Sequence, residues 1–424
     1  MKDIPDAVVS STPIFNLPED LMYEIFLELC DGIEDPAPKL SLVCRRWRNA
    51  ILDAPILWSN IQFRTPPPYY IQELRLQRSK SAPLIVTIIP DIYSSLPMGM
   101  RSLALIIKLL RPHVHRFDSL NIMSMKPKGL RTFFDELGHI EAPLLKHLVV
   151  RGAVDAKKWT LKPFGGYATG LLTLHVVTGR TNWDSSLLCH LTTLSLGDTW
   201  CSWDISVFDI LTTLSQTPCL RDLSLQFDDG DLRIGKTWKS SQVKLECLVN
   251  IYISGLLHSS ITKPWVECLL FGILAPGLSA FPSNISPTCL TALNNCPTFP
   301  LPGLKNLQMI HNPTKSQNEL TISLNSFPAL IKNLPQLRQL TLRGTQLDEI
   351  TLHTLSTQLP FLDTLVICDL PLSFGGLKVM VLARIIDDNL SALRSLFALK
   401  SYRVVGWPES EVEWFKAHIF KVQA

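Results

Sequence analysis

The stretch IFNLPEDLMYEIFLELCDGIEDPAPKLSLVCRRWRNAILDAPILWSNI, from Ile14 to Ile61, decides how the rest of the chain is interpreted. Its apolar residues recur at helical spacing in two blocks, and a segment that carries a tryptophan follows them. We therefore expect two short amphipathic helices and an exit segment. A unit of under roughly fifty residues buries too little apolar surface to be stable alone, so it needs a partner or the rest of the chain.

The first predicted helix starts at Leu17 and Pro18. Proline suits a first helical turn because its missing N–H has no partner there, and Glu19 and Asp20 suit the positive end of the helix dipole. The apolar residues that follow share one broad helix face, since they recur every four residues with neighbours one step round. They are Leu21, Met22, Ile25, Phe26 and Leu29.

Gly32, Pro36 and Pro38 predict that this helix stops within the segment 31–38. A second helix is predicted over residues 39–52, with its arginines mostly off the apolar face. That face holds Leu40, Val43, Cys44, Trp47 and Ile51. Two such helices cannot bury both apolar faces against each other, so the remaining apolar surface is a candidate partner-binding face.

Together these residues resemble an F-box, the three-helix module that docks onto the Skp adaptor of cullin-RING ubiquitin ligases. The resemblance is carried by LPEDL at 17–21, IF at 25–26, LVCRRWR at 42–48 and LW at 57–58. The segment 30–38 is longer and richer in proline and acid than the link in the shortest F-boxes. The resemblance implies adaptor contacts, some of them internal to the module, among Leu17, Pro18, Leu21, Ile25, Phe26, Leu40, Val43, Cys44, Trp47 and Trp58.

A plainer interpretation is that the two helices form a hairpin that merely caps the domain behind it. The exposure of Leu21, Phe26, Val43 and Trp47 distinguishes the two interpretations. A cap would pack this face onto the first repeats, whereas a docking module would leave it open.

The composition indicates a globular protein rather than a disordered one. Of the 424 residues, 46% are hydrophobic and 18% are charged. The formal net charge of +3 at pH 7 gives no electrostatic footprint for nucleic acid. The basic run at 45–48 is interpreted as the solvated side of a helix, so no nucleic-acid partner is expected.

Ten cysteines are scattered without a C-x-x-C pair, which argues against a zinc site. Reduced thiols in a cytoplasmic or nuclear protein account for them. Residues 1–13 lack the pattern of a signal peptide and are expected to be flexible. The uncharged stretch 268–303 is too interrupted by prolines for a membrane-spanning helix, so no membrane partner is expected.

A pattern of Leu-x-x-Leu-x-Leu, or a close variant, recurs along the chain and indicates a repeat fold. Clear copies start at Leu144, Leu171, Leu191, Leu220, Leu304, Leu337 and Leu362, and weaker ones at Phe117, Leu245 and Leu399. The interval from Leu245 to Leu304 is about twice the mean, so a worn repeat is expected within 251–303. Segments with helical periodicity lie between copies, including 204–216, 347–359 and 377–396.

This alternation predicts a parallel sheet with right-handed crossovers. The repeats resemble leucine-rich repeats, and with RSKSAPLIV at 78–86 the chain resembles the large F-box and leucine-rich-repeat families of fungi, especially mushroom-forming ones. The expected fold is α/β: an all-helical F-box, then an irregular right-handed leucine-rich-repeat solenoid with parallel strands on one side and helices on the other. The expected boundaries are 1–13 for the N-terminus, 14–61 for the F-box, 62–80 for a linker with a helix at 70–79, and 81–424 for the repeat domain.

Alternate strand positions point away from the core and build the face that solenoids use for binding. This face is mixed polar, with no run of one charge, which suits a protein partner better than a phosphate backbone. The candidate target-binding residues on it are His147, Arg151, His175, Asp222, Gln226, Gln339 and Arg343. Taken singly, each of them also fits an ordinary solvated strand position.

The sequence contains no phosphate-binding glycine loop, no G-x-S-x-G elbow and no H-E-x-x-H helix. The acidic turn at 228–231 lacks the remaining ligands of a calcium loop. No enzyme activity, cofactor or metal is therefore expected.

The resemblance implies a substrate-receptor subunit of a Skp–cullin–F-box ubiquitin ligase. The N-terminal module would bind the Skp adaptor, and through it a cullin, while the solenoid holds an unknown protein substrate. The alternative is a leucine-rich-repeat scaffold with an F-box-like cap and no ligase role.

Overall fold

The computed structural model describes most of the chain in separate ranges. They are 17–32, 36–64, 68–89, 100–152, 164, 168–177, 185–198, 206–227, 242–254, 264–283, 303–310, 327–343, 349–368, 374–386, 395–399, 409–419 and 421–423. The chain forms two compact units. The first unit contains residues 1–152 and 163–170, and the second contains residues 153–162 and 171–424.

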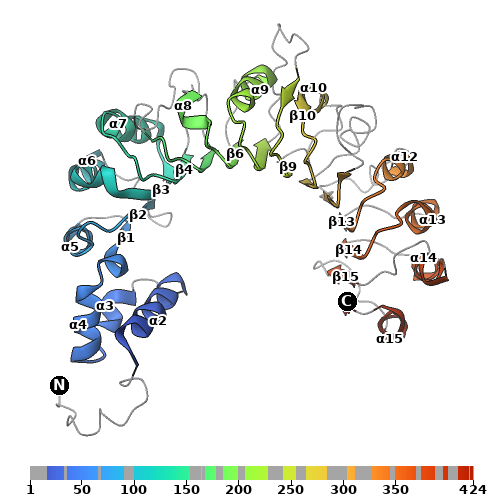
Figure 1. The fold of residues 1–424 in the computed structure, drawn as a ribbon, viewed down its shortest axis with the longest axis horizontal. Coiled ribbons are helices and arrows are strands. Elements are labelled where there is room, and N and C mark those ends of the chain that lie inside the picture. Colours follow the sequence, from blue (N-terminus) through green and yellow to red (C-terminus); the bar gives the residue numbers. More distant parts are fainter. Residues whose placement is uncertain are drawn as a thin grey trace. The chain divides into compact units, whose positions relative to one another are not determined.

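The first unit begins with short helices and then alternates strands with helices (Figure 1). The helical part consists of α2 (Glu19–Gly32), α3 (Pro36–Leu40), α4 (Arg45–Asp53) and the 3-10 turn η2 (Pro55–Trp58). The alternating part consists of β1 (Asn60–Arg64), α5 (Tyr70–Arg78), β2 (Leu84–Ile89), α6 (Met100–Leu110), η3 (Arg111–Arg116), β3 (Phe117–Met125), α7 (Pro127–Leu137) and β4 (His147–Gly152).

The second unit continues the alternation. Its first half contains β5 (Thr173–Val177), α8 (Ser185–Leu188), β6 (Thr193–Asp198), α9 (Val207–Ser215), β7 (Asp222–Phe227), β8 (Val243–Lys244), β9 (Asn250–Ser254), α10 (Pro264–Gly272), β10 (Ile273–Leu274) and β11 (Ala280–Ser283). Its second half contains β12 (Asn306–Ile310), α12 (Phe327–Lys332), β13 (Gln339–Arg343), α13 (Glu349–Gln358), β14 (Thr364–Cys368), α14 (Phe374–Ile386), β15 (Ser395–Leu399), α15 (Glu409–His418) and β16 (Lys421–Gln423).

The strands of each unit pair in parallel and nearly in chain order. The order is β1-β2-β3-β4 in the first unit and β5-β6-β7-β9-β11-β12-β13-β14-β15-β16 in the second. In each unit the helices lie on one side of the strands (Figure 1). This is the predicted fold class: helices at the N-terminus, then parallel strands and helices that alternate as in a leucine-rich-repeat solenoid.

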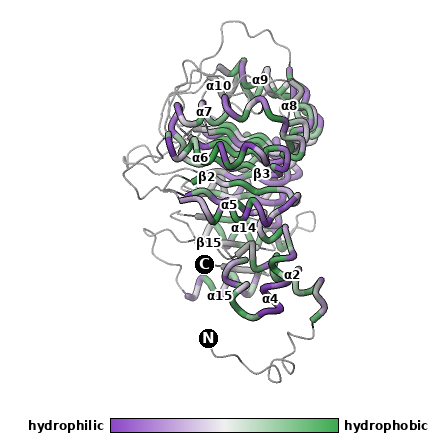
Figure 2. The backbone as a smooth tube through the Cα atoms, turned by 90° about the vertical axis from the view of Figure 1, so that its left-hand side faces the viewer, coloured by the Kyte–Doolittle hydropathy of each residue, from purple (hydrophilic) through white to green (hydrophobic). Residues whose placement is uncertain are grey.

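The repeat core consists of aliphatic side chains stacked in register from strand to strand. Leu194 of β6 lies opposite Leu223 of β7, which lies opposite Ile251 of β9, and all three are buried. The residues between them on each strand face the other way, because side chains alternate along a strand. Figure 2 shows the matching pattern on the helices, which carry both hydrophobic and hydrophilic residues.

The prediction of a single second helix over residues 39–52 was wrong. The chain forms α3 from Pro36, a turn, and then α4 from Arg45. Pro36 starts α3 instead of ending a helix, because a proline at the first position loses no intrahelical hydrogen bond. Cys44 is the N-cap of α4, and its Sγ accepts a hydrogen bond from the backbone N–H of Trp47 at 3.4 Å.

Residues 62–80, expected to be a linker, contain the end of β1 and all of α5. β1 pairs in register with β2, so the sheet starts at Asn60. The sequence missed this strand because its two buried residues, Ile61 and Phe63, are too few to set a pattern. The expected single repeat domain, 81–424, is also divided between the two units.

Two weak repeat copies are offset from their predicted positions. The register of β9 on β7 matches Leu248, not Leu245, to Leu220, so this copy reads LVNIYI. The copy predicted from Leu399 starts earlier, because β15 spans Ser395–Leu399. Consequently α14 ends at Ile386 rather than at Leu396. The worn repeat expected within 251–303 is confirmed as β11, whose Phe281 lies opposite Leu307.

Candidate functional site: the N-terminal helices and the strand face

The N-terminal helices enclose a small core of their own. It consists of Met22, Phe26, Ala37, Ala50, Ile51, Ala54, Leu57 and Trp58, with Leu17, Tyr23, Leu40, Trp47 and Leu52 packed at its edge. The ring of Phe26 meets that of Trp47 edge to face, with centroids 5.0 Å apart. All of these residues belong to α2, α3, α4, η2 or the short segments beside them. We call residues 17–58 the N-terminal module.

Trp58 connects this core to the first repeat. Its indole N–H donates to the backbone oxygen of Ile51 at 2.8 Å, and its side chain is only 2% exposed. The guanidinium of Arg78, at the end of α5, lies 4.4 Å from the centre of the Trp58 ring. The module is therefore fixed to the repeats at its exit.

Two arginines of α4 fix the ends of the neighbouring segments. Arg46 donates from Nη2 to the backbone oxygen of Leu17 at 2.7 Å, and Arg48 donates from Nε to the backbone oxygen of Ser41 at 3.0 Å. The turn between α3 and α4 is held between Ser41 and Cys44. Leu42 and Val43 therefore protrude from a fixed turn rather than from a helix.

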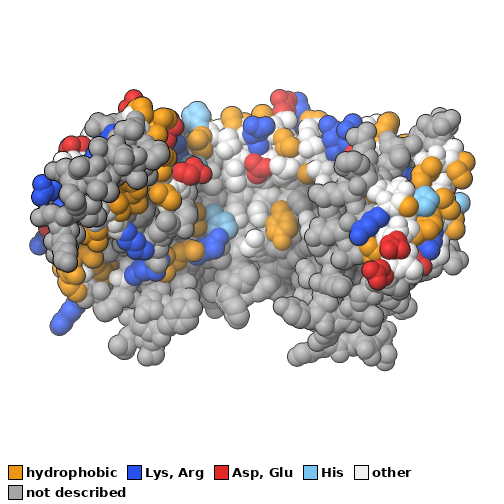
Figure 3. All heavy atoms as spheres, turned by 90° about the horizontal axis from the view of Figure 1, so that it is seen from below, with side chains coloured by type: hydrophobic (Ala, Val, Ile, Leu, Met, Phe, Trp, Pro, Cys, Tyr) orange, Lys and Arg blue, Asp and Glu red, His pale blue; other side chains and the backbone are white. Residues whose placement is uncertain are grey.

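Several large apolar side chains of the module face solvent although its core is complete without them. Leu21 and Ile25, one helical turn apart on α2, are 45% and 41% exposed, and Leu42 and Val43 are 67% and 59% exposed. We call these four residues the apolar docking set. Figure 3 shows hydrophobic side chains gathered among lysines and arginines at the end where these helices lie. Leu27 and Ile56 are exposed too.

The ten predicted adaptor contacts divide into three groups. Phe26 and Trp58 are buried in the core. Leu17, Leu40, Cys44 and Trp47 are half-buried, and Pro18, Leu21, Ile25 and Val43 are exposed. The sequence did not single out Leu42. The sequence signal for Leu42 is that it is an apolar residue directly beside Val43. In the single helix predicted over residues 39–52, however, helical spacing places Leu42 off the apolar face.

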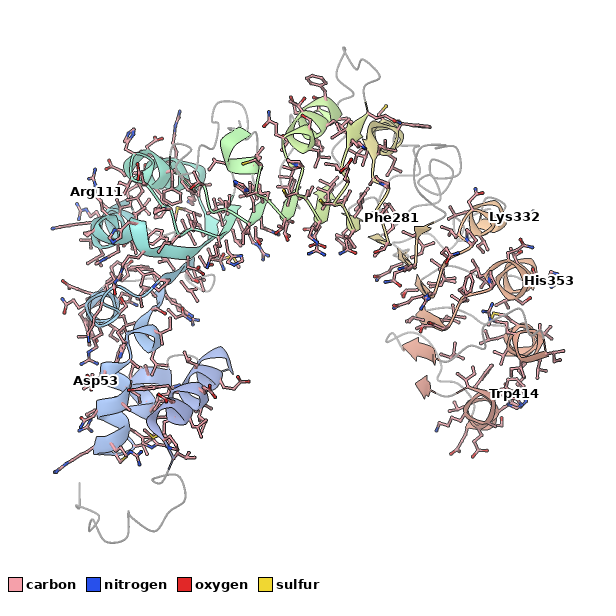
Figure 4. All side chains as sticks on the ribbon, viewed as in Figure 1. Asp53, Arg111, Phe281, Lys332, His353 and Trp414 are labelled. Atoms are coloured by element: carbon pink, nitrogen blue, oxygen red, sulfur yellow. The ribbon has the colours of Figure 1, made fainter. Side chains whose placement is uncertain are left out.

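The strand face of the second unit is lined by short polar side chains. In its first row, Thr193 lies opposite Asp222, which lies opposite Asn250, and the side-chain amide of Asn250 donates to Asp222 Oδ1 at 2.5 Å. Farther along, Asn306, Gln339, Thr364 and Ser395 continue the same row. Figure 4 shows Lys332 and His353 on the helices α12 and α13, away from these strands.

The predicted target-binding residues belong to strands of both units. His147 and Arg151 are exposed on β4 of the first unit. In the second unit His175, Asp222 and Gln226 are half-buried and Gln339 is exposed. Arg343 ends β13, and its side chain lies outside the described part of the chain. The structure brings Gln226 against Gly197 of β6, where a side chain would have no room.

The buried cations of the repeats have structural roles. Arg384 of α14 is 1% exposed and donates to the backbone oxygens of Leu355, Leu359 and Leu362 at 3.2, 2.8 and 2.7 Å. Burial lowers the pKa of Arg384 to about 10. The Arg384 guanidinium thus satisfies the carbonyl group of Leu355, in the last turn of α13, and those of Leu359 and Leu362 in the segment that follows the helix.

Within the described ranges, no three His, Cys, Asp or Glu side chains gather as metal ligands. The helices described are also too short or too polar to cross a membrane.

Comparison with known proteins adds one assignment. Residues 14–64 match the model of the F-box-like family. The N-terminal module is F-box-like. The match ends with β1, so it includes the apolar docking set and the exit through Trp58. No curated protein matches the chain.

Two solved structures are similar at low identity. A chain of the TLR13–ssRNA13 complex is 18% identical with a TM-score of 0.40, over 72% of this chain and 42% of that one. A chain of the Rad7–Elc1 complex from yeast is 13% identical with a TM-score of 0.37, over 96% and 97%. This chain thus spans less than half of the first neighbour. Neither similarity is close enough to support an argument about function.

Proposed function

We propose that the chain is the substrate-receptor subunit of a Skp–cullin–F-box ubiquitin ligase, related to the F-box and leucine-rich-repeat proteins of fungi. The F-box-like module binds the Skp adaptor, and through it a cullin, while the strand face binds a protein target. The chain performs no chemistry itself. It holds the target near the ubiquitin-loaded enzyme, which raises the effective concentration of the reacting groups. Such an assembly works in the cytoplasm, the nucleus or both.

The observation that carries this proposal is the exposure of the apolar docking set. Leu21, Ile25, Leu42 and Val43 face solvent while Phe26 and Trp58 complete a core beneath them. A hairpin serving only as a cap would bury this surface on the first repeats. An apolar surface that intramolecular packing leaves open is typical of a binding site for another protein.

The test is co-purification of the full chain with a Skp adaptor. Leu21→Asp with Val43→Asp places two charges in the docking set, so we expect adaptor binding to fall by about 100-fold or more, which is about 2.8 kcal/mol. A matched control is Leu105→Asp with Val379→Asp. These residues are 46% and 66% exposed but lie on α6 and α14, outside the module. The control should bind as the wild type does.

One observation favours the second candidate, a repeat scaffold with an F-box-like cap. The module continues directly into β1, and Arg78 stacks on Trp58, so it is part of the first unit rather than a separate domain. A folded wild type that does not bind the adaptor would support this scaffold and contradict the ligase proposal.

A further inference from the structure

The two exposed cysteines of the described part of the chain are Cys219 and Cys247. They belong to consecutive repeats of the second unit, just before β7 and β9. Each follows a turn position that faces solvent, and neither takes part in the repeat core. Their placement is independent of the proposed ligase function.

Cys219 and Cys247 occupy the same position in the same kind of turn. The N–H of Leu220 donates to the backbone oxygen of Thr217 at 3.2 Å, and the N–H of Leu248 donates to that of Leu245 at 3.3 Å. Each cysteine is thus the third residue of a four-residue turn. The register of the strands that follow pairs Asp222 with Asn250, so the two turns are stacked without offset.

Glycines in equivalent turns show how closely this position stacks on the preceding repeat. A Cβ at Gly277 would lie 3.1 Å from the backbone oxygen of Glu246 and 3.4 Å from that of Leu248, which flank Cys247. In the first unit, a Cβ at Gly170 would lie 2.9 Å from the oxygen of Pro143 and 3.6 Å from that of Leu145. The third residue of one turn therefore lies directly against the third residue of the turn before it.

The same stacking places Cys247 against Cys219. Adjacent strands are about 4.8 Å apart, and the two Cα atoms of a disulfide are usually about 4.4–6.8 Å apart. Both turns are on the surface, so their side chains can rotate toward each other without disturbing the core. We infer that Cys219 and Cys247 form an oxidisable dithiol that closes to a disulfide between two consecutive repeats when a peroxide reaches it.

The reaction balances with hydrogen peroxide as the two-electron oxidant. One cysteine, as its thiolate, attacks a peroxide oxygen and releases hydroxide, which gives a sulfenic acid. The sulfur of the second cysteine then attacks that sulfur and water leaves, so that two thiols and one peroxide give one disulfide and two waters.

An imidazole lies in the same column of turns. His190 is exposed and is the third residue of the turn before β6, whose Leu191 donates to Leu188 and whose Thr193 pairs with Asp222. It therefore precedes Cys219 by one repeat. On the other side, Glu246 adjoins Cys247 and is engaged by Lys244. Cys219 therefore has an imidazole one repeat before it, whereas Cys247 adjoins a carboxylate, and from this placement we assign the first reaction with peroxide to Cys219 and the resolution of the sulfenic acid to Cys247.

The experiment uses the reduced full chain treated with a small excess of hydrogen peroxide, followed by alkylation, digestion and mass spectrometry. We expect a peptide pair joined through Cys219 and Cys247, and the simultaneous loss of both residues from the alkylated pool. Cys189 and Cys268, which are half-buried, serve as internal controls and should still be alkylated after the peroxide treatment. The Cys247→Ser variant should accumulate a sulfenic acid at Cys219 that dimedone traps.

Phenylarsine oxide tests the proximity of the two thiols without oxidation, because its arsenic bridges two nearby sulfurs. The wild-type chain should bind one equivalent of phenylarsine oxide, and either Cys219→Ser or Cys247→Ser should abolish this binding. The disulfide should also raise the melting temperature, by about 5 °C, because it closes a loop through a whole repeat. Both cysteines remaining alkylated after peroxide treatment, or arsenical binding unchanged in the single variants, would overturn the inference.

Discussion

Leu42 and Val43 protrude from the N-terminal module, whereas the strand face of the second unit carries the half-buried polar side chains of Thr193, Asp222 and Asn250. The first surface offers apolar area and no hydrogen-bonding side chain at those positions. The second offers amides, hydroxyls and a carboxylate already engaged by Asn250. A partner of the first gains mainly from desolvation, and a partner of the second from hydrogen bonds, so the two surfaces suit two different proteins.

The interiors differ as well. The module depends on a few large rings, of which Trp58 is the largest, while the repeats depend on a ladder of aliphatic residues and on Arg384. A single substitution of one of these rings should therefore destabilise the module strongly. The effect of a substitution in the repeats should depend instead on how well neighbouring strands stack.

The largest expected effect is that of Trp58→Ala. Removing this ring should destabilise the module by about 3–5 kcal/mol, because it leaves a cavity and removes both the hydrogen bond to Ile51 and the stacking of Arg78. Hydrogen exchange of the amides in α2 and α4 measures this loss. Leu21→Asp should change the same exchange by less than about 0.5 kcal/mol, as an exposed substitution does. If the two variants changed the hydrogen exchange equally, the assignment of Trp58 to the core and of Leu21 to the exposed docking set would be contradicted.

Arg384→Met should destabilise the end of the second unit by about 3 kcal/mol, since three buried carbonyl groups lose their donor. Hydrogen exchange of α13 measures this loss of stability, with Ile386→Ala on the exposed side of α14 as the control.

Arg384 also gives the stability a pH dependence. Because the pKa of Arg384 in the folded chain is lowered to about 10, the unfolded chain binds more protons above that pH. This group's contribution to stability therefore rises with pH above about 10 and is constant near neutral pH.

Gly197→Ala should destabilise the junction of β6 and β7 by about 1–3 kcal/mol. The new Cβ would lie 2.5 Å from the Cβ of Gln226 and 2.9 Å from its backbone oxygen, so the strands must separate locally. Thermal unfolding measures the loss. Ser195→Ala, two residues earlier on the same strand, is the control and should cost less. If both variants have the same melting temperature, the close packing of Gln226 on Gly197 is not a determinant of stability.

The smallest expected effect is a pH dependence that comes from His113 in η3. Burial, with the charges of Arg116 and His115, lowers its pKa below the usual value for histidine. The unfolded chain therefore binds this proton more readily, and acidification through pH 6.5 and below costs stability. His113→Gln should reduce the fall in melting temperature between pH 7.5 and pH 5.5, taken as about one unit to either side of the ordinary histidine pKa. An identical fall in both proteins would contradict this contribution.

The sequence predicted the fold well because leucine spacing and strand register carry the same information. Residues such as Leu194, Leu223 and Leu340 must be buried for neighbouring strands to pair, so their positions reveal the repeat. The prediction was less accurate where one residue has two roles. Pro36 starts a helix rather than ending one, and Leu245 belongs to the turn before β9 rather than to its strand.

The candidate site was only partly predictable. Helical spacing put Leu21, Ile25 and Val43 on apolar faces, but the same spacing did so for the buried Phe26, and the F-box resemblance added the buried Trp58 to the contacts. A pattern that marks apolar residues does not separate the face that packs inward from the face that stays open. The break between α3 and α4, which exposes Leu42, depends on Cys44 acting as an N-cap, and cysteine is not a usual cap signal.

The central claim is that the F-box-like module binds its adaptor through the exposed apolar docking set. The direct measurement is a calorimetric titration of the purified full chain with a Skp adaptor at low and at high salt. Wild type should bind with an affinity that salt changes little, because desolvation of apolar surface rather than charge drives it. The Leu21→Asp, Val43→Asp variant should bind about 100-fold more weakly while its melting temperature is unchanged. A folded variant that binds as tightly as wild type, or a wild type that does not bind at all, would contradict the account.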